Sequence, residues 1–341
     1  MTLRRSARAA LLAPLVLSAF ALPAALSPAH AQVTDGTAAD ITGDESVSLR
    51  FAVEIGGEPF ACGQSYTGIG RTEGAVAVTD FRLFVSELAL IGADGQRVPV
   101  ALDDDGRWQD GQVALLDFEN GRDRCDNGTG PVNAQVSGQA PAGDYTGVEF
   151  VIGVPFDSNH GDPTLAGSPL NLTSMFWNWR GGYRFLKVDM VPVGGMAAHG
   201  EAPAHGEAVA HGGAMAEGKG TGHGGKMSHG AAPAGAWMLH LGSTGCTSTS
   251  RTSAPPEPCA QPNRVTVEFD AFDAASDLLV IDPAALLADS DLGTNTPDTS
   301  PGCMSFPGDA DCAGVLPRAG LAYGDLPGGE QQLVTVRSGA R

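Results

Sequence analysis

The chain has 341 residues and a formal net charge of −19, and only 6% of its residues are aromatic. A surface this acidic repels phosphate backbones and anionic lipids, which excludes nucleic acid as a partner and favours cations or basic protein surfaces. The one long apolar segment lies at the N-terminus, so the sequence predicts no transmembrane segment in the body of the chain.

Residues 1–31 have the pattern of a secretion signal peptide. An apolar segment and a small-x-small cleavage site at Ala29-His30-Ala31 follow three basic residues, Arg4, Arg5 and Arg8. The arginine pair lacks the usual surroundings of a twin-arginine signal, which favours a Sec-type signal. We therefore predict a periplasmic or secreted protein, with a flexible segment over 32–46 and a β domain over 47–341.

The body of the chain is rich in strand patterns. Short runs of apolar and β-branched residues are separated by Gly, Pro, Asn and Asp clusters, and they predict strands over 49–55, 75–92, 112–118, 144–154, 183–193, 236–242 and 263–269. Helix signals are scarce, apart from a short helix or turn near residue 282. The fold class is therefore all-β, with a single β-sandwich-like domain stapled by disulfides. No linker indicates a second domain.

Six cysteines follow the leader, and an even number in an oxidising compartment argues for disulfides. The two closest pairs along the chain are Cys246–Cys259 and Cys303–Cys312. They leave Cys62–Cys125 as a long-range pair, although other connectivities stay open. Metal ligation by the cysteines is the alternative, but no C-x-x-C spacing supports it.

Residues 194–235 consist mainly of Gly, Ala, Pro and His and contain little that would form a core. They fall between two predicted strands, so we expect a long disordered loop insertion. Its imidazoles, together with nearby methionines, suit weak copper capture, and they belong to His199, His205, His211, His223 and His229. A low-complexity expansion without selected affinity is the alternative.

Two histidines remain outside the leader and the loop: His160 in "FDSNHGDP" and His240 in "WMLHLGSTGC". Two imidazoles alone make an incomplete site for a tightly bound metal, so a third ligand is required. A purely structural role for each histidine is the alternative. Catalytic motifs are absent from the sequence, since no G-x-S-x-G elbow occurs and the acidic residues at 103–105 lack EF-hand spacing.

From about residue 47 to 325 the chain resembles the MbnP family, exported proteins also described as the four-Cys partner of the metallo-mystery pair. The resemblance rests on a series of ordered blocks: "PFACGQSYTGIG", "TDFRLFVSELALIGADGQRVPV", "RWQDGQVALLDFENG", "GDYTGVEFVIGVPFDSNH", "SPLNLTSMFWNWRGGYRFLKVD", "HLGSTGC", "PNRVTVEF" and "GCMS". It implies a β-sandwich-like copper-binding protein. It also implies a partner, a diheme c-type enzyme similar to MauG and cytochrome c peroxidase (MbnH), which oxidises one tryptophan to kynurenine.

Carried onto this chain, the resemblance makes His160 and His240 the candidate copper ligands, with kynurenine as the third. The physical reason is that indole nitrogen is a donor only, whereas ring opening creates an aniline nitrogen and carbonyl oxygens. Trp108, beside an acidic turn, is the favoured site of modification. Trp177 and Trp179 are two residues apart and are expected on one face of a strand, as packing or as an electron relay. Trp237 is the least favoured.

The sequence therefore predicts a copper-binding protein, not an enzyme, with a role in copper acquisition, storage or delivery. The second hypothesis is a disulfide-stapled extracellular adhesion or scaffold domain with incidental histidines. A neighbouring gene for a diheme cytochrome with two C-x-x-C-H motifs would favour the first. A copper oxidoreductase is a weaker third, because one site with so few ligands offers little for substrate activation.

Overall fold

The computed structural model describes residues 43–126, 128–193 and 235–339. The predicted signal peptide (1–31), most of the segment expected to be flexible (32–46) and nearly all of the predicted loop (194–235) lie outside these ranges. The five loop histidines lie outside them too. Within the described ranges, no helix is long and apolar enough to cross a membrane.

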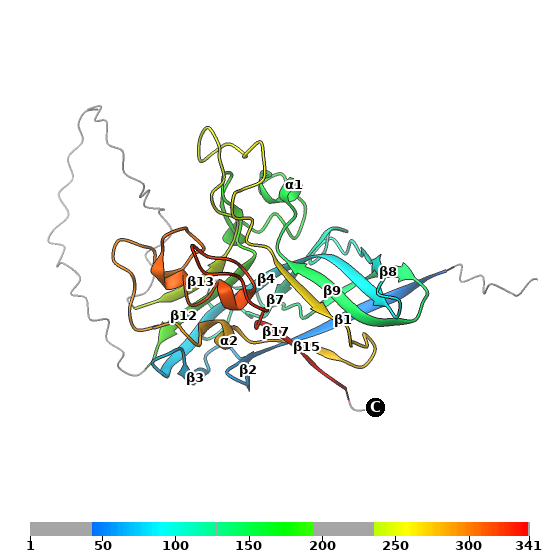
Figure 1. Ribbon diagram of the computed structural model, residues 1–341, viewed down its shortest axis with the longest axis horizontal. Coiled ribbons are helices and arrows are strands. Elements are labelled where there is room, and N and C mark those ends of the chain that lie inside the picture. The colour runs from blue at the N-terminus through cyan, green and yellow to red at the C-terminus, as the bar shows by residue number, and fades with distance from the viewer. Residues whose placement is uncertain (1–42, 127, 194–234, 340–341) are drawn as a thin grey trace, which may run out of the picture. The chain divides into compact units, whose positions relative to one another are not determined.

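The larger of two main β-sheets has nine strands: β3 (Ser65–Ile69), β4 (Gly74–Gly92), β5 (Arg97–Pro99), β7 (Val113–Asp117), β9 (Tyr145–Ile152), β12 (Leu186–Pro192), β13 (Trp237–Leu241), β14 (Val265–Phe269) and β16 (Gly302–Cys303). Their order is β14-β9-β4-β12-β13-β16, and β3, β5 and β7 also pair with β4. The smaller sheet has six strands: β1 (Asp44–Ile55), β2 (Glu58–Pro59), β6 (Ala101–Leu102), β8 (Gln135–Pro141), β15 (Leu278–Ile281) and β17 (Val334–Arg337). Figure 1 shows both sheets.

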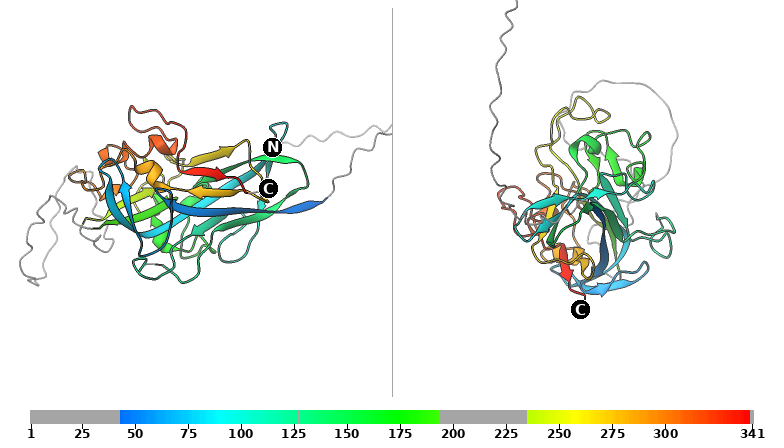
Figure 2. Two further views of the ribbon diagram at one scale, coloured as in Figure 1. Left: turned by 90° about the horizontal axis from the view of Figure 1, so that it is seen from below. Right: turned by 90° about the vertical axis from the view of Figure 1, so that its right-hand side faces the viewer.

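The remaining described elements are short. Two strands, β10 (Phe176–Asn178) and β11 (Gly182–Tyr183), form a small hairpin of their own. The α-helices are α1 (Phe156–Asn159) and α2 (Pro283–Leu287). Three 3-10 helices span Thr173–Met175, Ala310–Cys312 and Pro317–Ala319. In Figures 1 and 2, α1 and the loop that follows β13 lie side by side at one end of the domain.

β4 is the central strand of the larger sheet. It is 19 residues long and nearly all of it is buried, as expected for a strand with neighbours on both edges and cover on both faces. Its pairing with β9 shifts register between Ser86 and Ala89, where Glu87 has a φ of 54°. A bulge of this kind bends the strand, so β4 pairs with different neighbours along its length.

One hydrophobic core joins the two sheets. From Val47 to Ile55, every second residue of β1 is apolar and buried, as expected for a strand whose side chains alternate between two faces. Phe51 of β1 packs edge to face against Phe150 of β9, with ring centroids 5.8 Å apart. This two-sheet core confirms the prediction of an all-β, sandwich-like fold.

Every strand predicted from the sequence is present, with its ends shifted by a few residues, and α2 lies where the short helix was expected. Several short strands were not predicted, among them β3, β5 and β16 in the larger sheet and β2, β6 and β8 in the smaller one. β1 begins at Asp44, inside the segment expected to be flexible, because Asp44 already pairs with Pro141 of β8. β15 and β17 were not predicted, and β15 pairs in parallel with β1, Phe51 opposite Leu279.

The three disulfides are Cys62–Cys125, Cys246–Cys259 and Cys303–Cys312. The two short closures and the long-range staple favoured by the sequence are therefore confirmed. Cys246–Cys259 closes the loop that follows β13 and brings it beside α1, where one of the two isolated histidines lies.

Candidate metal centre

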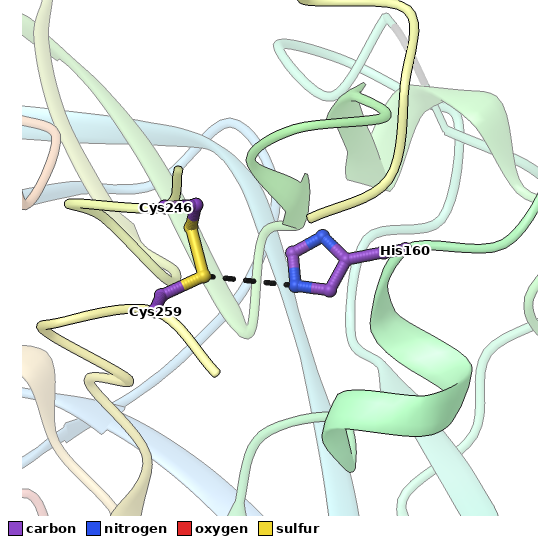
Figure 3. A group of neighbouring side chains, drawn as sticks. All are labelled: His160, Cys246 and Cys259. Atoms are coloured by element: carbon purple, nitrogen blue, oxygen red, sulfur yellow. Dashed lines mark hydrogen bonds between the residues drawn. A yellow bond between two sulfur atoms is a disulfide. The ribbon is translucent and has the colours of Figure 1, made fainter. Parts of the chain in front are cut away.

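His160 follows directly after the short helix α1 and is only 5% exposed. Its Nδ1 lies 3.1 Å from the backbone oxygen of Trp179. A carbonyl oxygen only accepts, so Nδ1 carries the proton and Nε2 keeps its lone pair. Nε2 accepts a hydrogen bond from the Asn159 amide nitrogen at 3.2 Å and lies 3.7 Å from Sγ of Cys259, toward which it points in Figure 3.

Asn159 fixes the position of α1. Its side chain is buried, accepts a hydrogen bond from the Tyr183 backbone at 2.8 Å, and donates to the Ser243 hydroxyl at 3.4 Å. A Cβ on Gly182 would lie 2.4 Å from the Asn159 amide, so only glycine allows this close approach. Through Asn159, His160 is tied both to β11 and to the chain just after β13.

His240 lies on β13 and is 3% exposed. Its Nε2 lies 2.6 Å from a carboxylate oxygen of Asp189 on β12, whereas its buried Nδ1 has no hydrogen-bond partner. Because an ionised carboxylate only accepts, Nε2 donates and Nδ1 presents a free lone pair. An orphaned buried nitrogen of this kind is costly unless something binds it.

Both imidazoles are neutral near pH 7. Burial lowers the pKa of His160, and the hydrogen bond to Trp179 only partly offsets this. Burial also lowers the pKa of His240, against the opposing effect of Asp189. Burial works against the charged form of Asp189 too, but the hydrogen bond from His240 and the charge of Lys187 hold the pKa of that carboxyl below its usual range. Neutral imidazole is the form that ligates metals.

A row of charged side chains crosses the larger sheet and ends at His240. The strand register places Asp117 of β7, Arg82 of β4 and Lys187 of β12 in line with it. Asp80 lies two residues before Arg82 on β4, and its carboxylate makes short contacts with Arg82 and Lys187. Side chains directly opposite each other in a sheet share a face, so these groups form one buried ionic network that locks Asp189 and hence the ring of His240.

At the end of this network away from His240, burial opposes the charged forms of two carboxylates, Asp117 and Glu119. Burial raises the pKa of Asp117 to about 7, despite the favourable charge of Arg82. Burial likewise raises the pKa of Glu119, whose carboxylate oxygens lack any hydrogen-bond partner. Arg82 lies 3.5 Å from Glu119, which is too far for a strong charged hydrogen bond.

The Trp177 side chain is buried and packs against the backbone that follows β13. It is 8% exposed, stacks on Phe306 with ring centroids 5.8 Å apart, and has the Arg184 guanidinium 5.8 Å from its ring. A Cβ on Gly242 would lie 2.5 Å from the indole, so the indole rests directly on the backbone two residues after His240.

Trp179 does not share a strand face with Trp177. β10 ends at Asn178, whose side-chain oxygen accepts hydrogen bonds from the backbones of Arg180 and Gly181 at 3.1 and 3.0 Å. This turn places Trp179 outside the strand, so the expectation of two indoles on one face is wrong. The turn instead directs the Trp179 carbonyl toward His160.

Trp108 lies in the acidic turn, half-buried. The carboxylate of Asp105 accepts hydrogen bonds from the backbones of Arg107, Trp108 and Gln109, which explains the acidic residues without calcium. The Arg107 guanidinium lies 4.8 Å from the centre of the Trp108 ring. No hydrogen bond or ring contact found in the described residues joins Trp108 to either histidine. The fourth indole, Trp237, is buried in β13.

The structure does not join the two histidines in one cluster of ligand atoms. Among the described residues, the group of potential ligands close enough to hold an ion consists of His160, Cys246 and Cys259, whose ligand atoms lie within 4.8 Å of one another. The two sulfurs are bonded to each other there and offer no thiolate. Each histidine nevertheless fits a metal, because one nitrogen is oriented by an oxygen acceptor and the other carries a lone pair, which accepts from the Asn159 amide in His160 and has no partner in His240.

The sequence did not single out the residues that orient the two histidines: Asn159, Asp80, Arg82, Lys187 and Asp189. A partial signal exists, since "DFR" and "KVD" place charges two residues apart inside strands, which predicts a polar sheet face. Part of the cover over this face comes from far along the chain, since Ser174 in the 3-10 helix before β10 accepts a hydrogen bond from Arg82 at 3.0 Å, and no pattern in the sequence shows this contact.

Comparison with known proteins agrees with this geometry at the level of the fold. A family model described as MbnP matches residues 44–305. No curated protein sequence matches the chain. Among solved structures, the chain is similar to MbnP from Methylosinus trichosporium, with a TM-score of 0.67 and 27% identity, over 87% of this chain and 100% of that one.

Proposed function

The chain belongs to the MbnP family, and we propose on that basis that it binds copper through His160, His240 and a kynurenine derived from one of its tryptophans. The proposed role is copper acquisition, storage or delivery, as a binding protein rather than an enzyme. The observation that carries the proposal is the state of the two histidines. Both are buried, and burial lowers the pKa of each, which favours the neutral ring. In each ring one nitrogen donates to an oxygen; the other nitrogen of His160 accepts from the Asn159 amide, and that of His240 has no partner.

Three ligands suit copper better than two, and an oxidised tryptophan supplies the third. Kynurenine has an aniline nitrogen and a ketone oxygen as ligand atoms, whereas indole nitrogen only donates. The contacts favour the segment around Trp177 and Trp179 over Trp108 as its source. The Trp179 carbonyl bonds His160, and the Trp177 ring lies against Gly242, close in sequence to His240.

We propose that a diheme c-type enzyme of the MauG and peroxidase group carries out the oxidation. Phe306 supports an approach of this enzyme from the side on which it lies, because it is 38% exposed and stacks on the buried Trp177. Export to the periplasm or the medium is part of the proposal, and three disulfides support an oxidising compartment.

The first test is peptide mass spectrometry on protein produced with and without the diheme partner. Conversion of tryptophan to kynurenine removes one carbon and adds one oxygen. We expect this change on the peptide that carries Trp177 and Trp179, and only with the partner. The Trp108→Phe variant is then expected to be modified normally. Modification confined to Trp108 would restore that residue as the third ligand, and unmodified tryptophans throughout would overturn the proposal.

Copper titration of the modified protein tests the ligands. His160→Ala and His240→Ala are each expected to lose the tight site, while a loop variant, His211→Ala, serves as the matched control and keeps it. Equal affinity in all three variants would assign copper binding to the loop and leave the buried histidines as structural residues.

A further inference from the structure

We propose that Cys246, Cys259 and His160 form a redox-gated site for monovalent copper, which is closed while the Cys246–Cys259 disulfide is intact and opens when a dithiol reduces it. This goes beyond the proposed function, because it requires neither His240 nor any modified tryptophan.

The three side chains already lie at coordination range of one another. Sγ of Cys259 is 3.7 Å from Nε2 of His160, and the ligand atoms of all three residues lie within 4.8 Å. Figure 3 shows the imidazole edge facing the sulfur-sulfur bond. Nδ1 donates to Trp179, so Nε2 is the nitrogen with the lone pair; the Asn159 amide donates to it at 3.2 Å, and a metal at this position would replace that hydrogen bond. Reduction therefore turns one ligand into three without moving the histidine.

The two cysteines differ in burial, and Cys246 is the one nearer to solvent. Cys246 is half-buried between two exposed residues, Gly245 and Thr247, whereas Cys259 is buried. The Cys303–Cys312 disulfide is fully buried at both sulfurs. Cys62–Cys125 has the same half-buried and buried pair but no histidine at hydrogen-bonding distance from its sulfurs in the described residues, which makes it a matched internal control.

The exchange balances as an ordinary dithiol reaction. A thiolate of the dithiol attacks Sγ of Cys246, the protein disulfide breaks, and Cys259 leaves as a thiolate that takes up a proton. The second dithiol sulfur then attacks the mixed disulfide and releases Cys246. The protein gains two electrons and two protons, and the dithiol becomes a disulfide. His160 favours the reduced state, because the new Cys259 thiol can then share the Nε2 lone pair with the Asn159 amide, which donates to it at 3.2 Å, whereas the disulfide has no proton to donate.

The backbone holds the two cysteines together after the sulfur-sulfur bond has broken. Thr244 and Gln261 form an isolated antiparallel bridge at the base of this loop, with hydrogen bonds of 2.9 and 3.0 Å. Ala260 also donates to the Gly245 carbonyl at 3.3 Å. The loop ends therefore stay paired when the disulfide opens, and the thiols remain beside His160.

The ligand set selects the metal. Two thiolates and one imidazole are soft or borderline donors, and among the metals they suit monovalent copper is the one with a low preferred coordination number. Copper displaces the two thiol protons on binding. Metal capture would then stabilise the reduced loop and oppose re-formation of the disulfide, so that redox state and copper occupancy are coupled.

The first experiment measures the order in which the disulfides open. Full-length protein produced without any diheme partner is incubated with dithiothreitol, trapped by alkylation and mapped by mass spectrometry. We expect Cys246 and Cys259 to be labelled before Cys62 and Cys125. In His160→Gln the reduction equilibrium of this disulfide is expected to fall by up to about tenfold, the size of one hydrogen bond, with Cys62–Cys125 unchanged. Preferential opening of Cys62–Cys125, or no effect of His160→Gln, would overturn the proposal.

The second experiment titrates the reduced and oxidised proteins with monovalent copper and follows the near-ultraviolet thiolate-to-copper absorption. Loop imidazoles and thioethers do not produce this signal. We expect one equivalent with thiolate character after reduction and none before, with loss in the Cys246→Ser/Cys259→Ser double variant and weaker binding in His160→Gln. Thermal melting checks that the variants are folded. An identical absorption before and after reduction, or full binding in the double variant, would refute the site. Both results are independent of kynurenine, so the proposed function stands or fails separately.

Discussion

The backbone carbonyl of Trp179 accepts a hydrogen bond from Nδ1 of His160 at 3.1 Å, across 19 residues of chain. This contact joins the aromatic segment after β10 to the imidazole after α1. It also fixes the tautomer of His160, since a carbonyl accepts only, and so leaves Nε2 as the nitrogen that faces the Cys246–Cys259 disulfide.

The turn that presents this carbonyl depends on Asn178, so we expect Asn178→Ala to weaken copper binding by the modified protein. Its side-chain oxygen accepts from two backbone nitrogens, those of Arg180 and Gly181. Residues that orient a ligating histidine typically change metal affinity about 10–100-fold, and we expect the low end of that range. Asn178→Asp keeps an acceptor and is the control. Competitive copper titration measures both, and equal affinity in Asn178→Ala would show that the turn does not orient His160.

Asp189→Asn is expected to destabilise the fold by about 3 kcal/mol at neutral pH, because it removes the charge that pairs with Lys187 and orients His240. The pKa of Asp189 is depressed in the folded state, so its contribution is present above the unfolded-state pKa of about 3.9 and is lost as pH falls. Urea unfolding of wild type and variant at about pH 7 and about pH 3 measures this. If the difference in unfolding free energy between wild type and variant were the same at both pH values, Asp189 would not have a depressed pKa in the folded state.

Asp117 is expected to affect the pH dependence of the unfolding free energy in the opposite direction to Asp189, and Asp117→Asn tests this. Burial raises the folded-state pKa of Asp117 to about 7, above the unfolded value. The folded state therefore holds the extra proton between about pH 4 and pH 7, and stability falls as pH rises through this window, by up to about 1.4 kcal/mol per pH unit for one group. The variant lacks this decline and is expected to be at least as stable as wild type at about pH 8. Unfolding free energies measured across the window test this, and parallel curves for the two proteins would exclude a buried titrating Asp117.

Gly242→Ala is expected to displace the Trp177 indole, because the added Cβ would lie 2.5 Å from the ring and 2.8 Å from the Tyr183 oxygen. Overpacking at such a site costs about 1–3 kcal/mol. A lower melting temperature and a changed near-ultraviolet circular dichroism signal are the expected results. Gly43→Ala, where nothing lies within 4 Å, is the control. Unchanged spectra in Gly242→Ala would mean that the ring adjusts without loss.

Strand patterns made most of the larger sheet predictable, because β4, β9, β12 and β13 are long or strongly apolar segments bounded by turn residues. β15 was not predictable in the same way. It is a four-residue run directly before a helix, and its identity as a strand comes from pairing with β1.

The sequence predicted the two buried histidines of the site but not the residues that orient them. His160 and His240 stand out by elimination, but their orientation depends on partners far away in the chain, Trp179 for one and Asp189 for the other. The same-face expectation for Trp177 and Trp179 failed because Asn178 prefers to cap a turn with its own side chain, which ends the strand between the two indoles. A period-two argument holds only while the strand continues.

The parallel pairing of β1 with β15 has a consequence for biogenesis. The first strand of the domain is flanked by β8 on one side and by β15 on the other, and β17 adds to β15 near the end of the described chain. The smaller sheet therefore cannot close until nearly the whole of the described chain is available for pairing. Until then β1 presents unpaired strand edges of the kind that aggregate, so a chain of this topology is exposed to aggregation until its last strands have been made.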